Sequence, residues 1–294
     1  MASKALITGA TGFVGGNLAR RLVHDGWSIC AVTRPNSSLK RLESIKQDIS
    51  VFCHDGTTES LCRFANKVKP DIVFHLASLF LASHSTADVE PLIRSNILFG
   101  AQILEAATKA RVHRLINVGT YWQHYDNKEY NPVCLYAATK QAFAAILRYY
   151  IETTPLRATT LELYDTYGPD DPRPKLLNIL KDAARTHKTL DMSAGEQMLD
   201  MIHIDDVTDA FVVAAERLLD GIARKDETFS VCSGNPQSLR QIVAEFEKAK
   251  GLTLDIRWGK CPYREREVMV PWNQGRKLVG WEPKISLQKG LVDV

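Results

Sequence analysis

The chain has 294 residues, too long for one small domain and long enough for a large α/β unit with an appended lobe. Hydrophobic residues make up 45% of it and charged residues 24%, as in an ordinary soluble enzyme, and no stretch approaches the roughly 20 apolar residues that cross a membrane. The net charge of +3 comes from 37 basic and 34 acidic residues without long like-charged runs, which argues against a nucleic-acid partner.

The cysteines and the chain ends carry no processing or metal signal. Six cysteines show no Cys-x-x-Cys spacing, so we expect free and mostly buried thiols, no disulfide framework and no metal site. The first residues show no signal peptide and no myristoylation glycine, and the last three residues form no prenylation motif. We therefore expect a cytoplasmic protein with no membrane partner.

The first predicted element is a short apolar strand over 4–8, followed by a glycine-rich turn and a helical pattern. Strand, glycine-rich turn and helix is the context of a dinucleotide-binding motif, because glycines bring main-chain N–H groups close to a pyrophosphate at the helix N-terminus. The alternative is a glycine turn without a ligand. The turn predicts cofactor contacts from Gly9, Thr11, Gly12, Phe13, Val14 and Gly15.

The next predicted strand, 28–33, ends at a basic residue. Arg34 lies about 20 residues beyond the glycine turn, where an acidic residue would bind the ribose hydroxyls of NAD. A guanidinium there, with Ser37 close behind, can hold a 2′-phosphate by charge-assisted hydrogen bonds. The alternative is a solvated arginine after a strand. We predict NADP(H) as the cofactor.

Strands and helices then alternate as in a parallel sheet, and polar residues follow the strand ends. Asp55 and Gly56 follow the third strand, where an adenine would lie, so the Asp55 carboxylate either accepts from the adenine amino group or belongs to a turn. Asn96, on a long helix, is expected to be structural. Thr120 closes a central strand, where ligands bind in open parallel sheets. The expected segments are strands 49–54, 71–76 and 114–118, and helices 58–67 and 89–110.

Tyr136 and Lys140 lie four residues apart at the start of a predicted helix over 136–153, and therefore on one helix face. A tyrosine is a poor acid–base catalyst at neutral pH because its pKa is about 10, and a nearby ammonium favours its phenolate. Of nine tyrosines, this is the only one followed four residues later by lysine. Tyr136 is thus a candidate proton carrier; the alternative is a buried tyrosine beside a solvated lysine.

Together these segments resemble the extended short-chain dehydrogenases/reductases of the nucleotide-sugar branch. The resemblance rests on the glycine turn, Thr120, Tyr136-x-x-x-Lys140 and two further runs, His75-Leu76-Ala77 and Tyr167-Gly168-Pro169. It implies an α/β fold with a doubly wound parallel sheet (Rossmann) and a smaller mixed α/β C-terminal substrate lobe. It also implies a catalytic set of Thr120, Tyr136 and Lys140, with Leu76 and Ala77 beside the cofactor.

The resemblance also suggests how the chain is divided. We expect residues 1–168, with a return segment at about 200–235, to form the dinucleotide-binding domain, and 169–199 and 236–294 to form the substrate lobe. Helices 89–110 and 136–153 would pair with a second copy in a four-helix bundle, giving a homodimer. Within the second half, Asp205 and Asp206 are expected to cap a helix over 207–219, and 239–250 has helical periodicity.

The substrate side departs from the family pattern. Many relatives carry an amide where this chain has Asp165, and a carboxylate cannot donate a hydrogen bond unless it is protonated. An arginine near Arg264 binds the diphosphate in the family, although 264–267 could equally form an ion-paired strand. The predicted substrate-binding residues are Thr120, Tyr121, Asp165, Lys175 and Arg264.

Three functions fit these residues. NADPH-dependent reduction of a 4-keto-(di)deoxy nucleotide sugar to the 4-hydroxy sugar fits Arg34 and the catalytic set. A nucleotide-sugar 4-epimerase would use the same residues with tightly bound NAD, and a non-catalytic NADP-binding regulator would tend to lose Tyr136 or Lys140. A 4,6-dehydratase needs an acidic pair where Tyr121-Trp122 stands. The run 164–175 looks most like reductases of the CDP-abequose and CDP-paratose synthase type, which finish deoxysugars of bacterial surface polysaccharides, so we predict the reductase.

Overall fold

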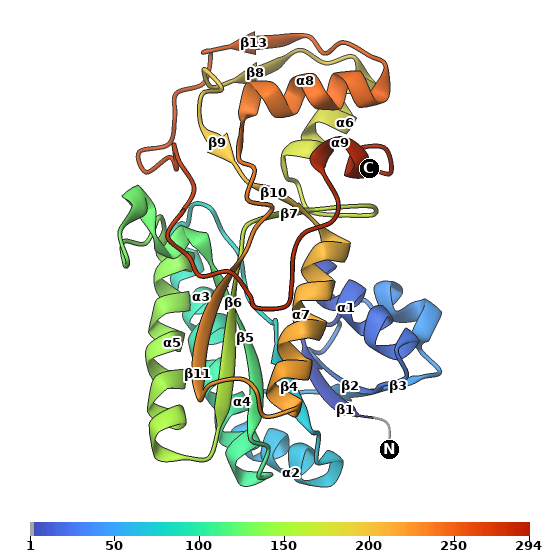
Figure 1. Ribbon diagram of the computed structural model, residues 1–294, viewed down its shortest axis with the longest axis vertical. Helices are drawn as coiled ribbons and strands as arrows, with labels where there is room; N and C mark the ends of the chain where they lie inside the picture. The colour runs from blue at the N-terminus through green and yellow to red at the C-terminus, as the bar shows by residue number, and fades with distance from the viewer. Residues whose placement is uncertain (1–2) are drawn as a thin grey trace.

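The computed structural model describes residues 3–294 (Figure 1). Its main body is a seven-stranded sheet in the order β11-β6-β5-β4-β1-β2-β3, with every neighbouring pair parallel. The chain runs outward from β1 to β3 and then returns to β4 on the other side of β1, so the sheet is doubly wound as predicted. The strands are β1 (Lys4–Thr8), β2 (Ser28–Thr33), β3 (Ile49–Cys53), β4 (Ile72–His75), β5 (Arg114–Thr120), β6 (Arg157–Leu163) and β11 (Asp226–Val231).

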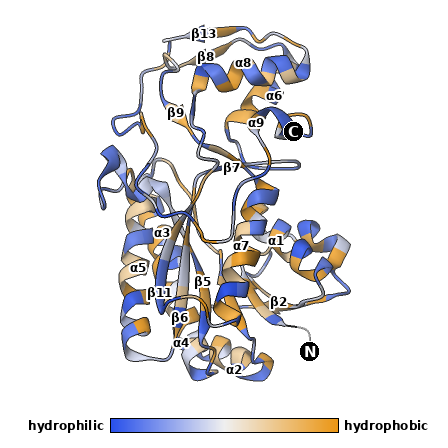
Figure 2. Ribbon diagram, viewed as in Figure 1, coloured by the Kyte–Doolittle hydropathy of each residue, from blue (hydrophilic) through white to orange (hydrophobic). Residues whose placement is uncertain are grey.

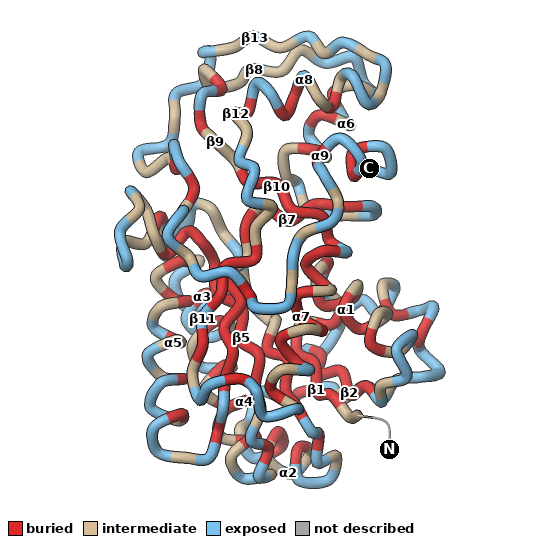
Figure 3. Tube along the Cα trace, in the orientation of Figure 1, coloured by how far each residue is buried: buried red, intermediate tan, exposed pale blue. Residues whose placement is uncertain are grey.

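Helices cover both faces of this sheet because successive strand residues point to opposite sides. In β1, Ala5 and Ile7 pack into one hydrophobic cluster and Leu6 into another. The first cluster lies under α1 (Phe13–His24) and α7 (Ile204–Leu219). The second lies under α2 (Thr58–Val68), α4 (Phe99–Lys109) and α5 (Leu135–Thr153). Buried segments follow the central strands in Figure 3, and hydrophobic residues concentrate there in Figure 2.

The long helix predicted over 89–110 is not regular. It consists of α3 (Val89–Ile93), a π-helical turn η3 (Arg94–Leu98) and α4. Asn96, in the π-helical turn, is buried: its side chain accepts from the Leu79 main-chain N–H at 2.7 Å and donates to Thr139 Oγ1 at 2.9 Å. Asn96 therefore has the structural role expected of it, because it holds the segment after β4 against α5.

The smaller lobe, at the top of Figure 1, has three two-stranded sheets and a core of its own. Leu180, Ile242 and Leu291 are fully buried in that core. The chain enters the lobe after β6, leaves it along α7, which packs on the main sheet, and enters it again after β11. Its elements are β7 (Asp165–Tyr167), α6 (Leu176–Thr186), β8 (Leu190–Met192), β9 (Met198–Leu199), β10 (Met201–His203), β12 (Gln237–Ser238), α8 (Leu239–Lys250), β13 (Ile256–Trp258) and α9 (Leu287–Gly290).

The capping role predicted for Asp205 and Asp206 is wrong. The N-cap of α7 is His203, whose Nδ1 accepts from the Asp205 main-chain N–H at 3.2 Å. Asp206 is buried, and its carboxylate accepts from the main-chain N–H groups of Lys284 and Ile285, both at 2.9 Å. It therefore ties the C-terminal segment to α7, a long-range contact that capping rules do not predict.

The cysteines are free as expected, but most are not buried. Only Cys30 is buried, while Cys53 and Cys261 are exposed. Cys53 ends β3, which lies at the edge of the sheet, and Cys261 lies in a loop of the smaller lobe. Within residues 3–294, no helix is long and apolar enough to cross a membrane.

Candidate active site

The turn after β1 is packed so closely that it needs glycine. Gly9 has a φ of +73°, and a Cβ on it would lie 2.7 Å from the main-chain nitrogen of Ala77. A Cβ on Gly15 would lie 2.3 Å from the carbonyl oxygen of Gly9. Gly12 is the N-cap of α1 and offers no side-chain acceptor, so the first-turn N–H groups of this helix are left for a ligand. This cradle fits the pyrophosphate of a dinucleotide.

The predicted adenosine-side residues lie at the ends of β2 and β3. Arg34 is exposed after β2, and none of the ion pairs among residues 3–294 involves it. Ser37 closes a turn by donating its main-chain N–H to the Arg34 carbonyl at 3.2 Å. Arg41, which the sequence reading missed, lies in η1 (Lys40–Ile45) with its guanidinium carbon 5.8 Å from the Phe13 ring centroid. Arg34 is thus an exposed cation at the end of β2, and Arg41 is a second cation beside the glycine turn.

Asp55 is largely occupied by its own turn. Its Oδ1 accepts from the Thr57 main-chain N–H, the Thr57 hydroxyl and the Ser60 hydroxyl at 2.6–2.8 Å. These hydrogen bonds lower the pKa of Asp55 to about 2. Gly56 accepts from Gln102 Nε2 through its carbonyl at 3.0 Å. Only Oδ2 of Asp55 remains for an adenine amino group, so the turn role weighed from the sequence accounts for most of its contacts.

The structure brings Thr120, Tyr136 and Lys140 together. Thr120 is the last residue of β5, and the other two lie in the first turns of α5, all three buried. The side chains of Thr120 and Ser78 lie near enough to the Tyr136 hydroxyl to favour its ionised form. Lys140 Nζ lies 5.9 Å from the Tyr136 ring centroid. A proton carrier, a hydroxyl and a cation therefore share one buried site.

The ionisation of this set differs from the sequence expectation. Burial raises the pKa of Tyr136 above its ordinary value, and the side chains of Thr120 and Ser78 oppose that rise without overcoming it. Burial also lowers the pKa of Lys140 to about 8. A neighbouring ammonium favours the phenolate of Tyr136, but burial has the larger effect on its pKa. Tyr136 keeps its proton at neutral pH, which suits a donor to a carbonyl oxygen.

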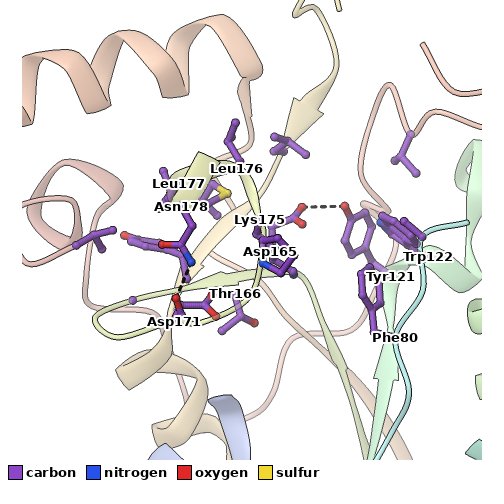
Figure 4. A pocket seen from close by; sticks show the side chains of 18 of the residues that line it. Phe80, Tyr121, Trp122, Asp165, Thr166, Asp171, Lys175, Leu176, Leu177 and Asn178 are labelled. Carbon is purple, nitrogen blue, oxygen red and sulfur yellow. Dashed lines mark hydrogen bonds between the residues drawn. The ribbon is translucent and has the colours of Figure 1, made fainter. Parts of the chain in front are cut away.

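A cavity of about 240 Å³ lies beside Phe80, Tyr121 and Trp122 (Figure 4), and none of Thr120, Tyr136 and Lys140 lines it directly. Phe80 forms the link: its ring centroid lies 4.9 Å from that of Tyr136 and 5.5 Å from that of Trp122. Tyr121 donates from its hydroxyl to Asp165 Oδ2 at 2.8 Å. The predicted substrate residues Tyr121, Asp165, Lys175 and Arg264 all line this cavity, together with apolar side chains that include Leu176, Leu177, Met201 and Val268.

Residues 264–267 do not form the strand that was the alternative to a diphosphate site. The Glu267 main-chain N–H donates to the Arg264 carbonyl at 3.0 Å, which closes a turn. The Arg264 guanidinium donates to both carboxylate oxygens of Glu267, at 2.9 and 2.8 Å, and its central carbon lies 5.1 Å from the Trp122 ring centroid. Arg264 therefore lines the cavity as an already paired cation.

Sequence reasoning missed Phe80, Met201 and Arg173. Arg173 pairs with Asp171 at 2.6 Å and lies 4.6 Å from the Phe13 ring centroid. Phe80 follows the carboxyl end of β4, and that position alone could have marked it as a ligand contact. Met201 and Arg173 carry no comparable signal, because only the folding of the smaller lobe brings them to the site.

A family model described as the NAD dependent epimerase/dehydratase family matches residues 5–231, from β1 to the end of β11. The chain belongs to this family. Its segments are those of an extended short-chain dehydrogenase/reductase, as the sequence indicated. The match contains the glycine turn and the catalytic set. A nicotinamide cofactor is consistent with the family description and with the cradle between β1 and α1.

Relatives align over nearly the whole chain. A CDP-abequose synthase of Yersinia pseudotuberculosis is 28% identical over 287 residues, covering 96% of each chain. A UDP-glucose 4-epimerase of Mycolicibacterium smegmatis is 25% identical over 312 residues, covering 98% of this chain and 96% of the relative. The solved UDP-glucose 4-epimerase of Thermotoga maritima with UDP-glucose superposes with a TM-score of 0.86 at 21% identity, covering 99% and 96% of the two chains, which shows the shared fold.

Proposed function

We propose that this protein is an NADPH-dependent reductase that converts a 4-keto-(di)deoxy nucleotide sugar to the 4-hydroxy sugar in deoxysugar biosynthesis. The observation that favours reduction is Arg34, an exposed cation that forms no ion pair with any residue from 3 to 294 and stands where an NAD enzyme has a carboxylate. The substrate class is supported by the similarity to CDP-abequose synthase over nearly the full length of both chains.

The geometry supports a role for each catalytic residue. NADPH, when bound, supplies the hydride that goes to the carbonyl carbon. Tyr136 donates its proton to the carbonyl oxygen, and the Thr120 hydroxyl hydrogen-bonds to that oxygen. Lys140 binds the nicotinamide ribose and stabilises the phenolate left by proton transfer. One hydride and one proton thus convert the carbonyl to a hydroxyl.

An epimerase with tightly bound NAD would use the same three residues, and the relative from Mycolicibacterium smegmatis favours that second candidate. Epimerisation requires the sugar to rotate within the cavity, so that its other face is presented to the cofactor. Tyr121, beside Thr120, is fixed by Asp165 and by stacking on Tyr164, with ring centroids 4.7 Å apart and planes 17° apart. A fixed aromatic wall at this position restricts such a rotation, which favours the reductase. The regulator is disfavoured because Tyr136 and Lys140 lie together.

We also propose the division expected from the sequence, with 1–168 and about 200–235 as the dinucleotide domain and the remainder as the substrate lobe. The separate core of the smaller lobe supports this division, and Tyr167 and Met201, which pack in that core, lie at its two boundaries. We further propose a cytoplasmic location and a homodimer formed through α4 and α5. The dimer is supported by two exposed hydrophobic side chains: Leu98, just before α4, exposes 46% of its surface, and Tyr149, on α5, exposes 63%.

The test is to mix the protein with NADPH and a 4-keto-6-deoxy or 4-keto-3,6-dideoxy nucleotide sugar and to follow absorbance at the reduced-nicotinamide band. We expect one NADPH consumed for each hydroxyl formed. Tyr136→Phe is the matched control and should consume almost none. Interconversion of two 4-hydroxy sugars without net consumption of cofactor would contradict the proposal and favour the epimerase.

A further inference from the structure

The charged side chains that line the cavity are not equivalent. Asp165 accepts from the Tyr121 hydroxyl, Asp171 pairs with Arg173, and Arg264 pairs with Glu267. Lys175 also lines the cavity, yet its ammonium has no hydrogen bond or ion pair within residues 3–294. Lys175 is therefore the one lining charge whose partner the described chain does not supply.

Lys175 stands close to the catalytic set. It is the N-cap residue of α6, and its Nζ lies 5.6 Å from the ring centroid of Phe80, the same ring that contacts Tyr136. Figure 4 shows Lys175 beside Asp165, with Tyr121, Trp122 and Phe80 on the opposite side of the cavity. Phe80 is therefore a shared neighbour of Lys175 and Tyr136.

The surroundings of Lys175 make an unpaired ammonium costly. Burial lowers the pKa of Lys175, and the charge of Asp165 opposes that effect without forming an ion pair. The cavity walls are mainly apolar and aromatic. Lys175 is half-buried, and a bound ligand with a negative charge would supply the partner that its ammonium lacks among the described residues.

Resting on the proposed function, we propose that Lys175, and not Arg264, is the residue by which the pocket recognises an anionic group of its substrate. Two groups share this chemistry: the diphosphate of a nucleotide sugar, or a carboxylate on the sugar. Arg264 is unsuited because Glu267 already takes two of its N–H donors. Its guanidinium carbon also lies 5.1 Å from the centroid of the Trp122 ring, which lines the same cavity.

Binding without turnover tests this assignment. The probes are CDP, UDP, cytidine, uridine, UDP-glucose and UDP-glucuronate, measured by calorimetry on the full chain without NADPH. Lys175→Met should weaken the binding of CDP or UDP by roughly 10- to 160-fold, the loss of one charge-assisted contact. The nucleosides should be unaffected, Lys175→Arg should retain most of the affinity, and Arg264→Met should lose less than about threefold because its charge is already paired.

The outcomes separate the two sources of the anion. A loss on both nucleoside diphosphates and nucleotide sugars assigns Lys175 to the diphosphate, and a loss confined to UDP-glucuronate assigns it to a sugar carboxylate. Equal affinity of wild type and Lys175→Met for every probe, including no measurable binding by either, overturns the assignment, as does a larger loss in Arg264→Met. Unchanged NADPH affinity in both variants shows that they are folded. Failure of NADPH reduction, by contrast, would count against the reductase alone.

Discussion

The two ends of the active site are built in different ways. The cofactor end is formed by one continuous stretch, the turn between β1 and α1, where the main chain makes the shape and glycines permit it. The substrate end is formed by side chains from loops after β4 and β5, from β7, from the start of α6 and from residues 264–268. A contiguous, main-chain site is encoded locally. A site assembled from distant side chains is not encoded by one local pattern, and it is there that the chain carries Asp165 in place of the amide that the family resemblance implied.

The substitution Tyr136→Phe should separate catalysis from cofactor binding most clearly, because it removes the hydroxyl that donates the proton and leaves the glycine turn intact. We expect turnover to fall by roughly 10²–10⁴-fold, the usual worth of general acid–base help, with the affinity for NADPH nearly unchanged. Steady-state kinetics and cofactor titration measure the two quantities. Retention of more than about a tenth of the wild-type rate would show that Tyr136 is not the proton donor.

At the cofactor end, Arg34→Ala should weaken NADPH much more than NADH. One lost charge-assisted contact of roughly 1.5–3 kcal/mol corresponds to roughly 10- to 160-fold in affinity. The dissociation constants of both cofactors are the readout, and Lys67→Ala, on α2 away from the end of β2, is the control. Equal weakening of the two cofactors, or tighter binding of NADH by the wild type, would remove the assignment of NADP.

Lys140 is proposed both to bind the cofactor and to assist catalysis, so its ionisation should make the affinity for NADPH depend on pH. Because burial lowers the pKa of Lys140 to about 8, its ammonium is present below that pH and is lost as pH rises through it. NADPH affinity should therefore fall above about pH 8, by up to about tenfold per pH unit if only the charged form binds. Lys140→Met should bind weakly at every pH and turn over slowly. A wild-type affinity that is flat from pH 7 to about pH 10 would contradict the ribose contact.

The smallest effect is expected at the substrate end from Tyr121→Phe, which deletes the hydrogen bond to Asp165 and keeps the ring stacked on Tyr164. A hydrogen bond to a charged group is worth about 1.5–3 kcal/mol, but Asp165 can regain a partner from the substrate or water, so the expected rise in substrate KM is severalfold. NADPH affinity should stay the same. If the affinity for NADPH changed as much as the substrate KM, the cofactor end and the substrate end of the active site would not be independent of one another.

The features that could be predicted from the sequence are those set by neighbouring residues in the chain. The strand, glycine turn and helix that begin the chain were recognisable because Gly9, Gly12 and Gly15 are needed by the main chain itself, and the spacing of Tyr136 and Lys140 placed them on one helix face. The partners of Asp206 and the place of Lys175 and Arg264 in the cavity wall were not recognisable, because each depends on which distant segments pack together. Burial likewise raises the pKa of Tyr136, whereas the spacing of Lys140 alone suggested a lowered one, since desolvation is a property of the folded structure.

The central claim, net reduction with a cofactor that exchanges at each turnover, is tested most directly by isotope transfer. NADPH carrying deuterium on the transferred position of the nicotinamide ring is supplied with a 4-keto nucleotide sugar, and the product is analysed by mass spectrometry and NMR. The reductase predicts one deuterium per product molecule, located on the newly hydroxylated carbon, in both the first and later turnovers. Product formed without deuterium from the supplied NADPH would contradict the account and point to a captive cofactor that returns hydrogen taken from the sugar itself.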